Sequence, residues 1–202
     1  MKSSSLYQAQ LSTPFCVLGI RCVDEVLTSI DFLAPHSAEQ TPRDDFSREV
    51  CAQLQAYFSD AEFVFDLPLK LSGTEHQLKV WQAMRDIPPG QVLTYGAIAA
   101  LLKSSPRAVG QACGNNPIPV VVPCHRVVSK TGLGGFMHRA DDGALDIKRY
   151  LLKHENANGV LFDKPRSLSD LKNRSENSAG REQILTILQV NSRSIDQKSD
   201  EV

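Results

Sequence analysis

The stretch VLTYGAIAALLKSSPRAVGQACGNNP, residues 92–117, predicts two short helices joined by a tight turn. Thr94 is placed to cap the first helix, because its hydroxyl can accept a hydrogen bond from a free backbone N–H of the first turn. The apolar periodicity then breaks. Ser105 offers a second cap, and Pro106 suits the first helical position, where no N–H is needed. Two helices across so short a turn have the outline of a helix-turn-helix, although most helical hairpins do not bind DNA.

The second of these helices is made mostly of small residues. Ala108, Gly110, Ala112 and Gly114 give it weak helix propensity and little surface to bury. One interpretation is tight packing against another helix in the core. The other is a slim helix that fits a narrow groove of DNA, with Arg107 at its start pointing outward.

The run NNPIPVVVPCHRVV, residues 115–128, places a thiol, an imidazole and a guanidinium side by side. Prolines fix φ and remove N–H donors, so we expect a stiff extended segment here and not a central strand. A buried strand gains nothing from His and Arg, whereas a nucleophilic site needs a thiolate, a proton acceptor and a rigid support. The side chains of adjacent residues in an extended segment point to opposite sides, so we expect a bridging water to connect Cys124 and His125.

The chain before this region predicts a small sheet with one helix packed on it. Residues 15–33 contain β-branched runs broken near Gly19 and at the Asp24-Glu25 pair, which is typical of a strand pair or meander. Residues 43–58 place apolar side chains at helical spacing. Residues 62–71 then return to an extended pattern.

A flexible Ser-Gly pair favours a domain boundary at residues 70–73. Beyond it, Thr74 can cap a helix with four apolar side chains on its core face, namely Leu78, Trp81, Met84 and Ile87. A last helix is expected to begin near Asp141 or Asp142. The predicted fold class is α/β (α+β), with a sheet-plus-helix domain at residues 1–73, a mainly helical domain containing the helix-turn-helix at residues 74–163, and a disordered tail at residues 164–202.

Charge is unevenly distributed along the 202 residues. Residues 1–73 carry 5 Lys and Arg against 10 Asp and Glu, residues 74–160 carry 10 against 6, and residues 161–202 carry 7 against 7. The basic middle segment suits contact with phosphates, although a surface of mixed charge explains the count equally well.

Five cysteines with irregular spacing favour free thiols in a reducing compartment. No apolar run approaches the roughly 18 residues of a membrane helix. The N-terminus lacks the apolar centre of a secretory signal. We therefore expect a cytoplasmic protein that has no membrane partner.

The segment NPIPVVVPCHRVV resembles the active-site signature of the O6-alkylguanine-DNA alkyltransferases, also called methylated-DNA–protein-cysteine methyltransferases. VWQAMRDIPPGQVLTYGAIA upstream and IKRYLLKHE downstream agree with it, so the resemblance covers about residues 74–160. It implies DNA repair by direct reversal. The protein would flip a guanine out of duplex DNA and transfer the alkyl group on O6, or that on O4 of thymine, irreversibly to its own cysteine. We expect no cofactor, no metal among the site residues, and a monomer whose partner is double-stranded DNA; the absence of a C-x-x-C pair argues against a zinc knuckle.

The resemblance also implies which residues carry out the transfer. Cys124 would become a stable thioether, and His125 would act through water as its base, oriented by Glu155. Asn116 would brace the active-site turn by hydrogen bonds. Tyr95 would hydrogen-bond or protonate guanine N3.

The pocket for the flipped base would be completed by a cation and a loop. Lys148 would stabilise the activated site electrostatically. Three side chains are expected to line the substrate pocket, namely Val127, Phe136 and Met137. The sequence departs from the family here, because Phe136 stands where Tyr is common and the loop at residues 133–146 is longer.

On the DNA side, the resemblance makes Arg107 a finger that enters the base stack and fills the space left by the extruded nucleotide. Ala108, Ala112 and Gly114 would lie against the minor groove, and Thr94 is placed among the DNA-contacting residues.

Two other functions use part of the same pattern. A non-catalytic protein that recognises alkylated bases would lack the acceptor Cys124. A cysteine hydrolase or acyltransferase would use Cys124 and His125, but it would need an oxyanion hole and would have no use for an Arg107 finger. We expect Trp81, Met84 and Phe58 to belong to the core.

Overall fold

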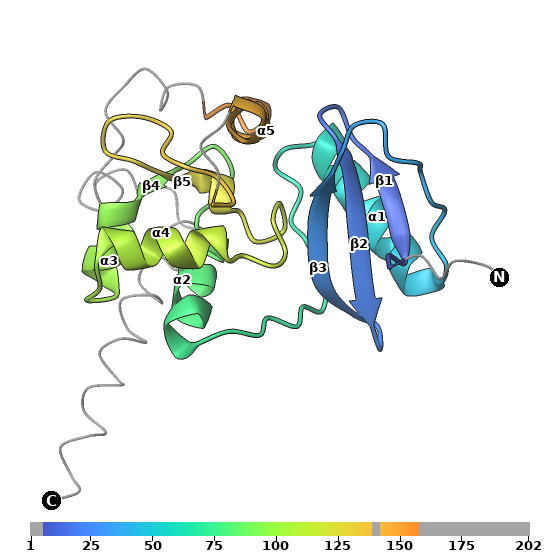
Figure 1. The fold of residues 1–202 in the computed structure, drawn as a ribbon, viewed down its shortest axis with the longest axis horizontal. Coiled ribbons are helices and arrows are strands. Elements are labelled where there is room, and N and C mark those ends of the chain that lie inside the picture. Colours follow the sequence, from blue (N-terminus) through green and yellow to red (C-terminus); the bar gives the residue numbers. More distant parts are fainter. Residues whose placement is uncertain (1–5, 139–141, 158–202) are drawn as a thin grey trace, which may run out of the picture.

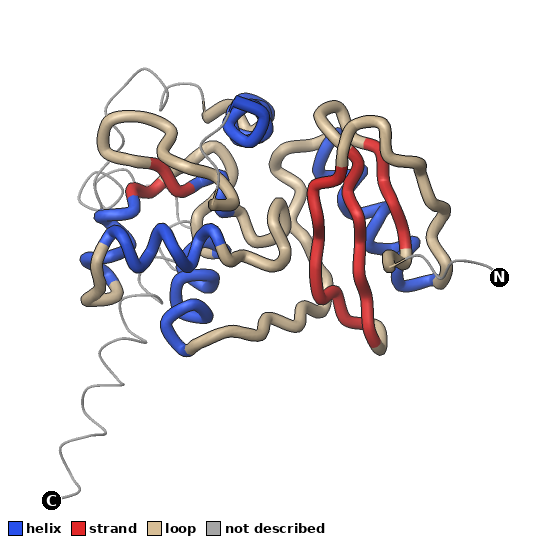
Figure 2. Tube along the Cα trace, viewed as in Figure 1, coloured by secondary structure: helices blue, strands red, loops and turns tan. Residues whose placement is uncertain are grey.

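The computed structural model describes residues 6–138 and 142–157. Within them, a three-stranded sheet and one helix precede a group of helices (Figure 1). The predicted order of a sheet-plus-helix half and a mainly helical half is thereby confirmed (Figure 2). The tail predicted at residues 164–202 lies outside the described residues.

The sheet is antiparallel and has the strand order β1-β2-β3, with β1 at Ala9–Ser12, β2 at Val17–Val23 and β3 at Val26–Leu33. The strand pair predicted over residues 15–33 is confirmed, and its turn lies at Asp24 and Glu25. Their φ values of 50° and 57° are those of a two-residue hairpin turn.

The break expected near Gly19 is wrong. Gly19 lies inside β2 and pairs with Gln10 on one side and Asp31 on the other. The ring of Tyr7 lies over this position, and a Cβ on residue 19 would be 2.6 Å from it. The glycine therefore allows a close approach within a continuous strand.

Helix α1 (Asp45–Ser59) packs against β1 and β2. Asp44 and Ser47 form a capping box: the Asp44 carboxylate accepts from the Ser47 N–H at 2.7 Å, and the Ser47 hydroxyl accepts from the Asp44 N–H at 3.2 Å. The helix predicted over residues 43–58 is thus confirmed. Its buried face includes Leu54 and Tyr57, and Tyr57 also reaches the helical half.

The segment between α1 and α2 forms no strand in the part of the chain that the structure describes. It touches the sheet through one bridge between Leu27 and Leu69. The extended pattern predicted for residues 62–71 is confirmed at that point. The expected domain boundary at residues 70–73 falls in this segment and stays a prediction.

Three capped helices follow, α2 (Glu75–Arg85), α3 (Tyr95–Leu101) and α4 (Pro106–Gly114). The caps expected at Thr74, Thr94 and Ser105 are all confirmed, and Pro106 occupies the first turn of α4. Helices α3 and α4 pack on each other as the predicted helix-turn-helix does.

The core face predicted for α2 is wrong at Leu78, which is 39% exposed. The buried stripe includes Val80, Trp81 and Met84 instead. The helical period is about 3.6 residues, so positions spaced strictly by three drift off the buried face, and adjacent positions such as Val80 and Trp81 cover it together. The Trp81 Nε1–H donates to the Ala112 carbonyl at 2.8 Å, which fixes α2 against α4.

The proline-rich segment is a tight turn, so the expectation of a stiff extended segment is wrong. The Val122 N–H donates to the Ile118 carbonyl at 2.9 Å, and Val120 has a left-handed φ of 74°. A single 3-10 turn, η1 (Cys124–Arg126), follows. Proline fixes φ at a value that turns and 3-10 helices also use, so it does not enforce extension.

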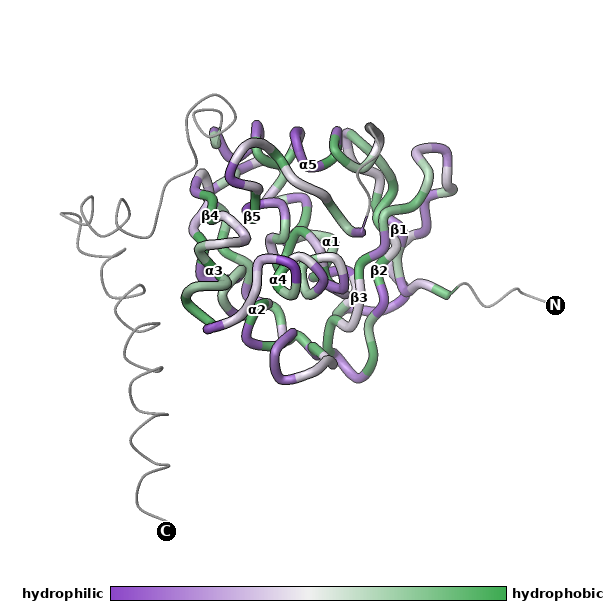
Figure 3. Tube along the Cα trace, turned by 60° about the vertical axis from the view of Figure 1, so that its left-hand side comes forward, coloured by the Kyte–Doolittle hydropathy of each residue, from purple (hydrophilic) through white to green (hydrophobic). Residues whose placement is uncertain are grey.

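Strand β5 (Val127–Val128) leaves this turn and pairs in parallel with β4 (Leu93–Thr94). Helix α5 (Asp142–His154) closes the fold. One hydrophobic cluster joins the sheet, α1 and the helical half. Hydrophobic and hydrophilic residues alternate along much of the chain, as expected of elements that bury one side (Figure 3).

In the described part of the chain, no helix combines the length and the apolar composition needed to cross a membrane. All five cysteines are buried free thiols, as predicted.

Candidate active site

Cys124 begins the 3-10 turn η1 and is 4% exposed. Its Sγ lies 3.8 Å from the Met137 Sδ. Burial raises the pKa of the Cys124 thiol, although a hydrogen bond with Asn116 and the charge of Lys148 act in the opposite direction. The resting residue is therefore a thiol, and its use as a nucleophile requires a proton acceptor.

His125 is completely buried next to it. Its Nε2 lies 2.9 Å from the Glu155 Oε1, and its Nδ1 makes no hydrogen bond within the described residues. Burial lowers the pKa of His125, and the attraction of Glu155 opposes this only in part. A neutral imidazole whose Nε2–H donates to Glu155 presents its Nδ1 lone pair as the acceptor.

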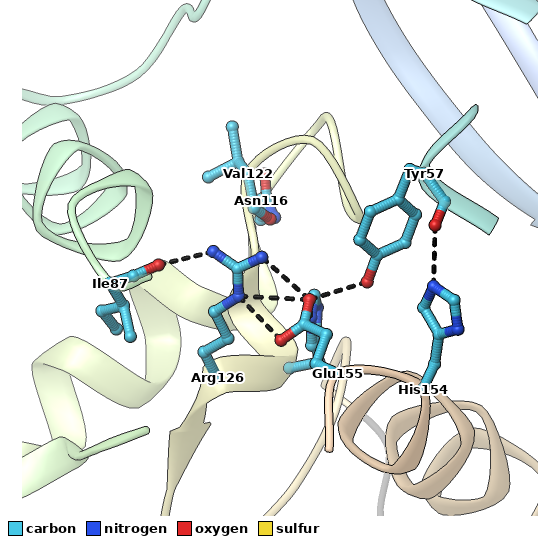
Figure 4. Close-up of polar contacts among 8 residues, drawn as sticks. Tyr57, Ile87, Asn116, Val122, Arg126, His154 and Glu155 are labelled. Carbon is cyan, nitrogen blue, oxygen red and sulfur yellow. Dashed lines mark hydrogen bonds and ion pairs between the residues drawn. The ribbon is translucent and has the colours of Figure 1, made fainter. Parts of the chain in front are cut away.

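Glu155 is the centre of a buried polar network (Figure 4). Its Oε1 accepts from the Tyr57 hydroxyl at 2.7 Å and from the Arg126 Nη2 at 2.8 Å, and its Oε2 accepts from the Arg126 Nε at 3.0 Å. Burial alone would raise the pKa of Glu155, but the hydrogen bonds from His125 and Arg126 and the charge of Arg126 outweigh it and hold that pKa well below its usual range. The carboxylate is therefore ionised and can orient the imidazole.

Asn116 fastens the turn that carries the cysteine. Its Nδ2 donates to the Val122 carbonyl at 2.7 Å, and its Oδ1 accepts from the Ile118 N–H at 3.1 Å. Both partners lie in the tight turn, so one buried amide defines its shape.

The Lys148 side chain binds backbone carbonyls of β5 and of the loop that follows it. Its Nζ donates to the carbonyls of Val127, Leu133 and Gly135 at 2.7, 2.6 and 3.0 Å. The ammonium also lies 5.8 Å from the centre of the Tyr95 ring. Burial lowers the pKa of Lys148 to about 8.

Tyr95 lies on the other side of the same loop. Its hydroxyl donates to the Gly135 carbonyl at 3.1 Å, and burial raises its pKa. Gly134 has a left-handed φ of 69°, and a Cβ there would be 2.8 Å from the Tyr95 ring. The loop therefore needs a glycine next to Tyr95.

The tip of this loop covers the cysteine. Phe136 is buried and packs against Phe32 of β3, with ring centres 5.6 Å apart. Met137 and His138 have left-handed φ values of 51° and 58°, and the Met137 Sδ lies beside the Cys124 Sγ. The third residue predicted for the pocket, Val127, has its side chain in the hydrophobic core.

Helix α4 presents only part of its small-residue surface. Arg107 is exposed at its start, and Ala108 and Gly114 are partly exposed. Ala112 is 2% exposed and faces α2, so its side chain belongs to the packing between helices, and its expected contact with DNA stays a prediction. Packing on Trp81 uses the side of the helix on which Ala112 lies.

His138 lies against the end of α4. A Cβ on Gly114 would be 2.4 Å from its imidazole, and its Nε2 lies 2.9 Å from the Asn115 Oδ1. Thr94 is engaged as the cap of α3. Among the described residues, no group of three or more His, Cys, Asp or Glu side chains is placed to hold a metal ion.

Two residues of the network, Tyr57 and Arg126, were not predicted from the sequence. Tyr57 is one of several apolar-face residues of its helix, and nothing in its spacing marks it. Arg126 adjoins the Cys-His pair, and a guanidinium inside an apolar run is a signal, because such a group must have a buried partner.

Comparison with known proteins shows the family to which this chain belongs. The family model described as 6-O-methylguanine DNA methyltransferase, DNA binding domain, matches residues 75–157. The chain is 38% identical over 161 residues to the methylated-DNA–protein-cysteine methyltransferase of Methanosarcina mazei, which covers 76% of this chain and 99% of the relative. The chain belongs to the methylated-DNA–protein-cysteine methyltransferase family.

Solved structures of this family have the same fold. The O6-methylguanine methyltransferase of Mycobacterium tuberculosis is 34% identical, with a TM-score of 0.62 and coverage of 76% of this chain and 97% of the relative. A structure of the M. tuberculosis protein in complex with DNA is 36% identical, with a TM-score of 0.60 and coverage of 76% and 98%.

Proposed function

We propose that this protein repairs duplex DNA by moving an alkyl group from O6 of guanine to the Sγ of Cys124, once per molecule. Family membership makes it a direct-reversal DNA repair methyltransferase. The observation that carries the assignment to Cys124 is a buried thiol next to a neutral imidazole whose far nitrogen is held by an ionised carboxylate.

The transfer is a displacement at the alkyl carbon. The thiol proton passes to the Nδ1 of His125, directly or through a water, and the sulfur forms a bond to the alkyl carbon. The bond from that carbon to O6 breaks, and its electron pair goes to the guanine. Glu155 stabilises the imidazolium that forms.

Tyr95 and Lys148 would act on the leaving base. A proton or hydrogen bond supplied to guanine N3 makes the purine a better leaving group, and the Tyr95 hydroxyl is protonated because burial raises its pKa. The positive charge of Lys148 favours the thiolate over the thiol at Cys124. Phe136 and Met137 would contact the base or its alkyl group.

The helix-turn-helix would deliver the base. A guanine in a duplex must be flipped out, which costs a few kcal/mol, and the exposed Arg107 would occupy the gap. The partly exposed small residues Ala108 and Gly114 would let α4 approach the minor groove. The structure of the M. tuberculosis relative in complex with DNA supports DNA as the partner. Action as a monomer, without a cofactor, belongs to the same proposal.

Intact mass after incubation with a duplex containing one O6-methylguanine tests the assignment. We expect a gain of one methyl group, about 14 Da, located on Cys124 and saturating at one per chain. Cys124→Ala should bind the duplex and gain nothing, while Cys113→Ala, which removes another buried thiol, should still react. A methyl group on another residue, or turnover without modification, would contradict the proposal.

A further inference from the structure

The carboxylate that orients His125 is also bound by a residue of the sheet-plus-helix half. The Tyr57 hydroxyl donates to the Glu155 Oε1 at 2.7 Å across 98 positions of sequence. Tyr57 lies on α1 and is completely buried. Burial raises the pKa of Tyr57, so the hydroxyl is a donor throughout the neutral range.

We propose that Tyr57 is a positioning residue for alkyl transfer, which acts through Glu155 on the basicity and orientation of His125. This inference rests on the proposed function, because it assumes that His125 is the base for Cys124. It makes the N-terminal helix α1 part of the catalytic apparatus.

Three side chains share one oxygen of Glu155. Tyr57, His125 and the Arg126 Nη2 all hydrogen-bond to Oε1, at 2.7, 2.9 and 2.8 Å. An oxygen that already accepts a strong hydrogen bond has less negative charge available for a second donor. The strength of the His125–Glu155 bond therefore depends on the Tyr57 hydroxyl.

Tyr57 also fixes the end of α5. Its carbonyl lies 2.7 Å from the Nε2 of His154, and the two rings are 5.2 Å apart (Figure 4). His154 directly precedes Glu155, so two consecutive residues are held by one tyrosine. This double attachment defines where the carboxylate lies relative to His125.

Other charged and titratable groups surround the pair. Arg126 and Lys148 disfavour the imidazolium form of His125, and Glu155 favours it. Tyr150 and His154 face Tyr57 from α5. Removal of the Tyr57 hydroxyl leaves the charge of Oε1 to His125 and Arg126, so the pKa of the imidazole should rise.

The test is Tyr57→Phe, compared with Phe58→Leu as a matched control. Phe58 packs on His154 at the same interface, with ring centres 6.4 Å apart, and its side chain has no polar group that could bind Glu155. Single-turnover transfer from a methylated duplex is followed between about pH 5 and pH 9, with the amplitude counting the active molecules. The rate constant is thereby separated from the folded fraction.

We expect Tyr57→Phe to slow transfer roughly tenfold at neutral pH, because the Glu155 carboxylate loses a bond that orients it toward His125, with unchanged affinity for the duplex. The acid limb of its pH profile should move upward by about half a unit or more, whereas Phe58→Leu should keep the wild-type limb. The same limb and rate constant in both variants would overturn the role of Tyr57. Wild-type protein that gains no methyl group would instead remove the proposed function.

A second measurement uses a substitution that preserves the packing. Replacement of Tyr57 by 3-fluorotyrosine gives a more acidic hydroxyl, which is a stronger donor to Oε1. The acid limb should then move downward, opposite to the shift in Tyr57→Phe. A limb that stays at the wild-type position would contradict the proposal even if Tyr57→Phe did not fold.

Discussion

Lys148 holds together the backbone around the pocket. One buried ammonium donates to three carbonyls, two of them in the loop that covers Cys124. A long apolar side chain could fill the space of its stem but could not replace its donors. The residue therefore has a structural role beside its electrostatic one.

Lys148→Met should lower the free energy of unfolding by about 3 kcal/mol, because the carbonyls would lose their donor away from water. Urea unfolding measures this. Lys153→Met, an exposed position on the same helix, is the control and should be close to neutral. Equal effects at the two positions would show that the three hydrogen bonds contribute no net stability.

Met137 limits the space next to Cys124. Its Sδ lies 3.8 Å from the Cys124 Sγ. Met137→Ala should therefore raise the ratio of benzyl to methyl transfer by about tenfold, measured with two otherwise identical duplexes. Met137→Leu, which keeps the volume, should leave the ratio near that of the wild type. A ratio that is the same in all three proteins would mean that the alkyl group does not pass Met137.

The residues of the site differ in how far the sequence reveals them. Cys124, His125 and Asn116 lie within one short motif. Glu155 directly follows a helix whose sequence also resembles that of the family. Tyr57 shares its spacing with ordinary core residues, and its partner lies 98 positions away. A hydrogen bond between distant segments leaves no periodic trace in either of them, so Tyr57 could not be predicted.

Among the elements, the helices were the most predictable. Each of α1 to α4 begins at an Asp, Thr or Ser whose side chain caps it, and these signals are local. Strand β1 has only four residues, and its burial alternates weakly, so the sequence contains little signal for it. The proline-rich turn was mispredicted because its shape comes from the side chain of Asn116, which the local φ preferences do not include.

Helix α4 presents the exposed Arg107 at its start. Arg107→Ala should slow repair of a methylated duplex about tenfold or more, while reaction with the free base O6-benzylguanine stays unchanged, because only the duplex requires base extrusion. Arg85→Ala, an exposed arginine on α2, is the control for a general loss of positive charge. Equal losses on both substrates would argue against a finger that fills the base stack.

Across the whole molecule, several thiols are buried, and the loss of hydration raises their pKa values. The pKa is about 11 for Cys16 and Cys51 and about 12 for Cys22 and Cys113, compared with an ordinary value of 9.0. At pH values between the ordinary pKa and the raised pKa, the thiols of the unfolded chain have lost protons that the thiols of the folded chain retain. Stability must therefore fall as the pH rises through this window.

We expect the free energy of unfolding to fall by several kcal/mol between pH 9 and pH 11, because each thiol contributes at most about 1.4 kcal/mol per pH unit. Lys148 acts in the opposite direction from pH 8 upward, but it is a single group opposed by these thiols and by two buried tyrosines whose pKa values are also raised. Urea unfolding at successive pH values measures the slope, and Cys51→Ala should make it shallower. A flat profile would contradict the assignment of these thiols as protonated in the folded state.

The contact between Tyr57 and Glu155 also bears on the order in which the protein is made. During translation the reactive cysteine leaves the ribosome before Glu155, which must then fold back onto a helix synthesised much earlier. A nascent chain thus has its thiol before it has an oriented base. Because the proposed reaction uses each molecule only once, we expect this order of synthesis to keep the acceptor unmodified until the last helix is in place.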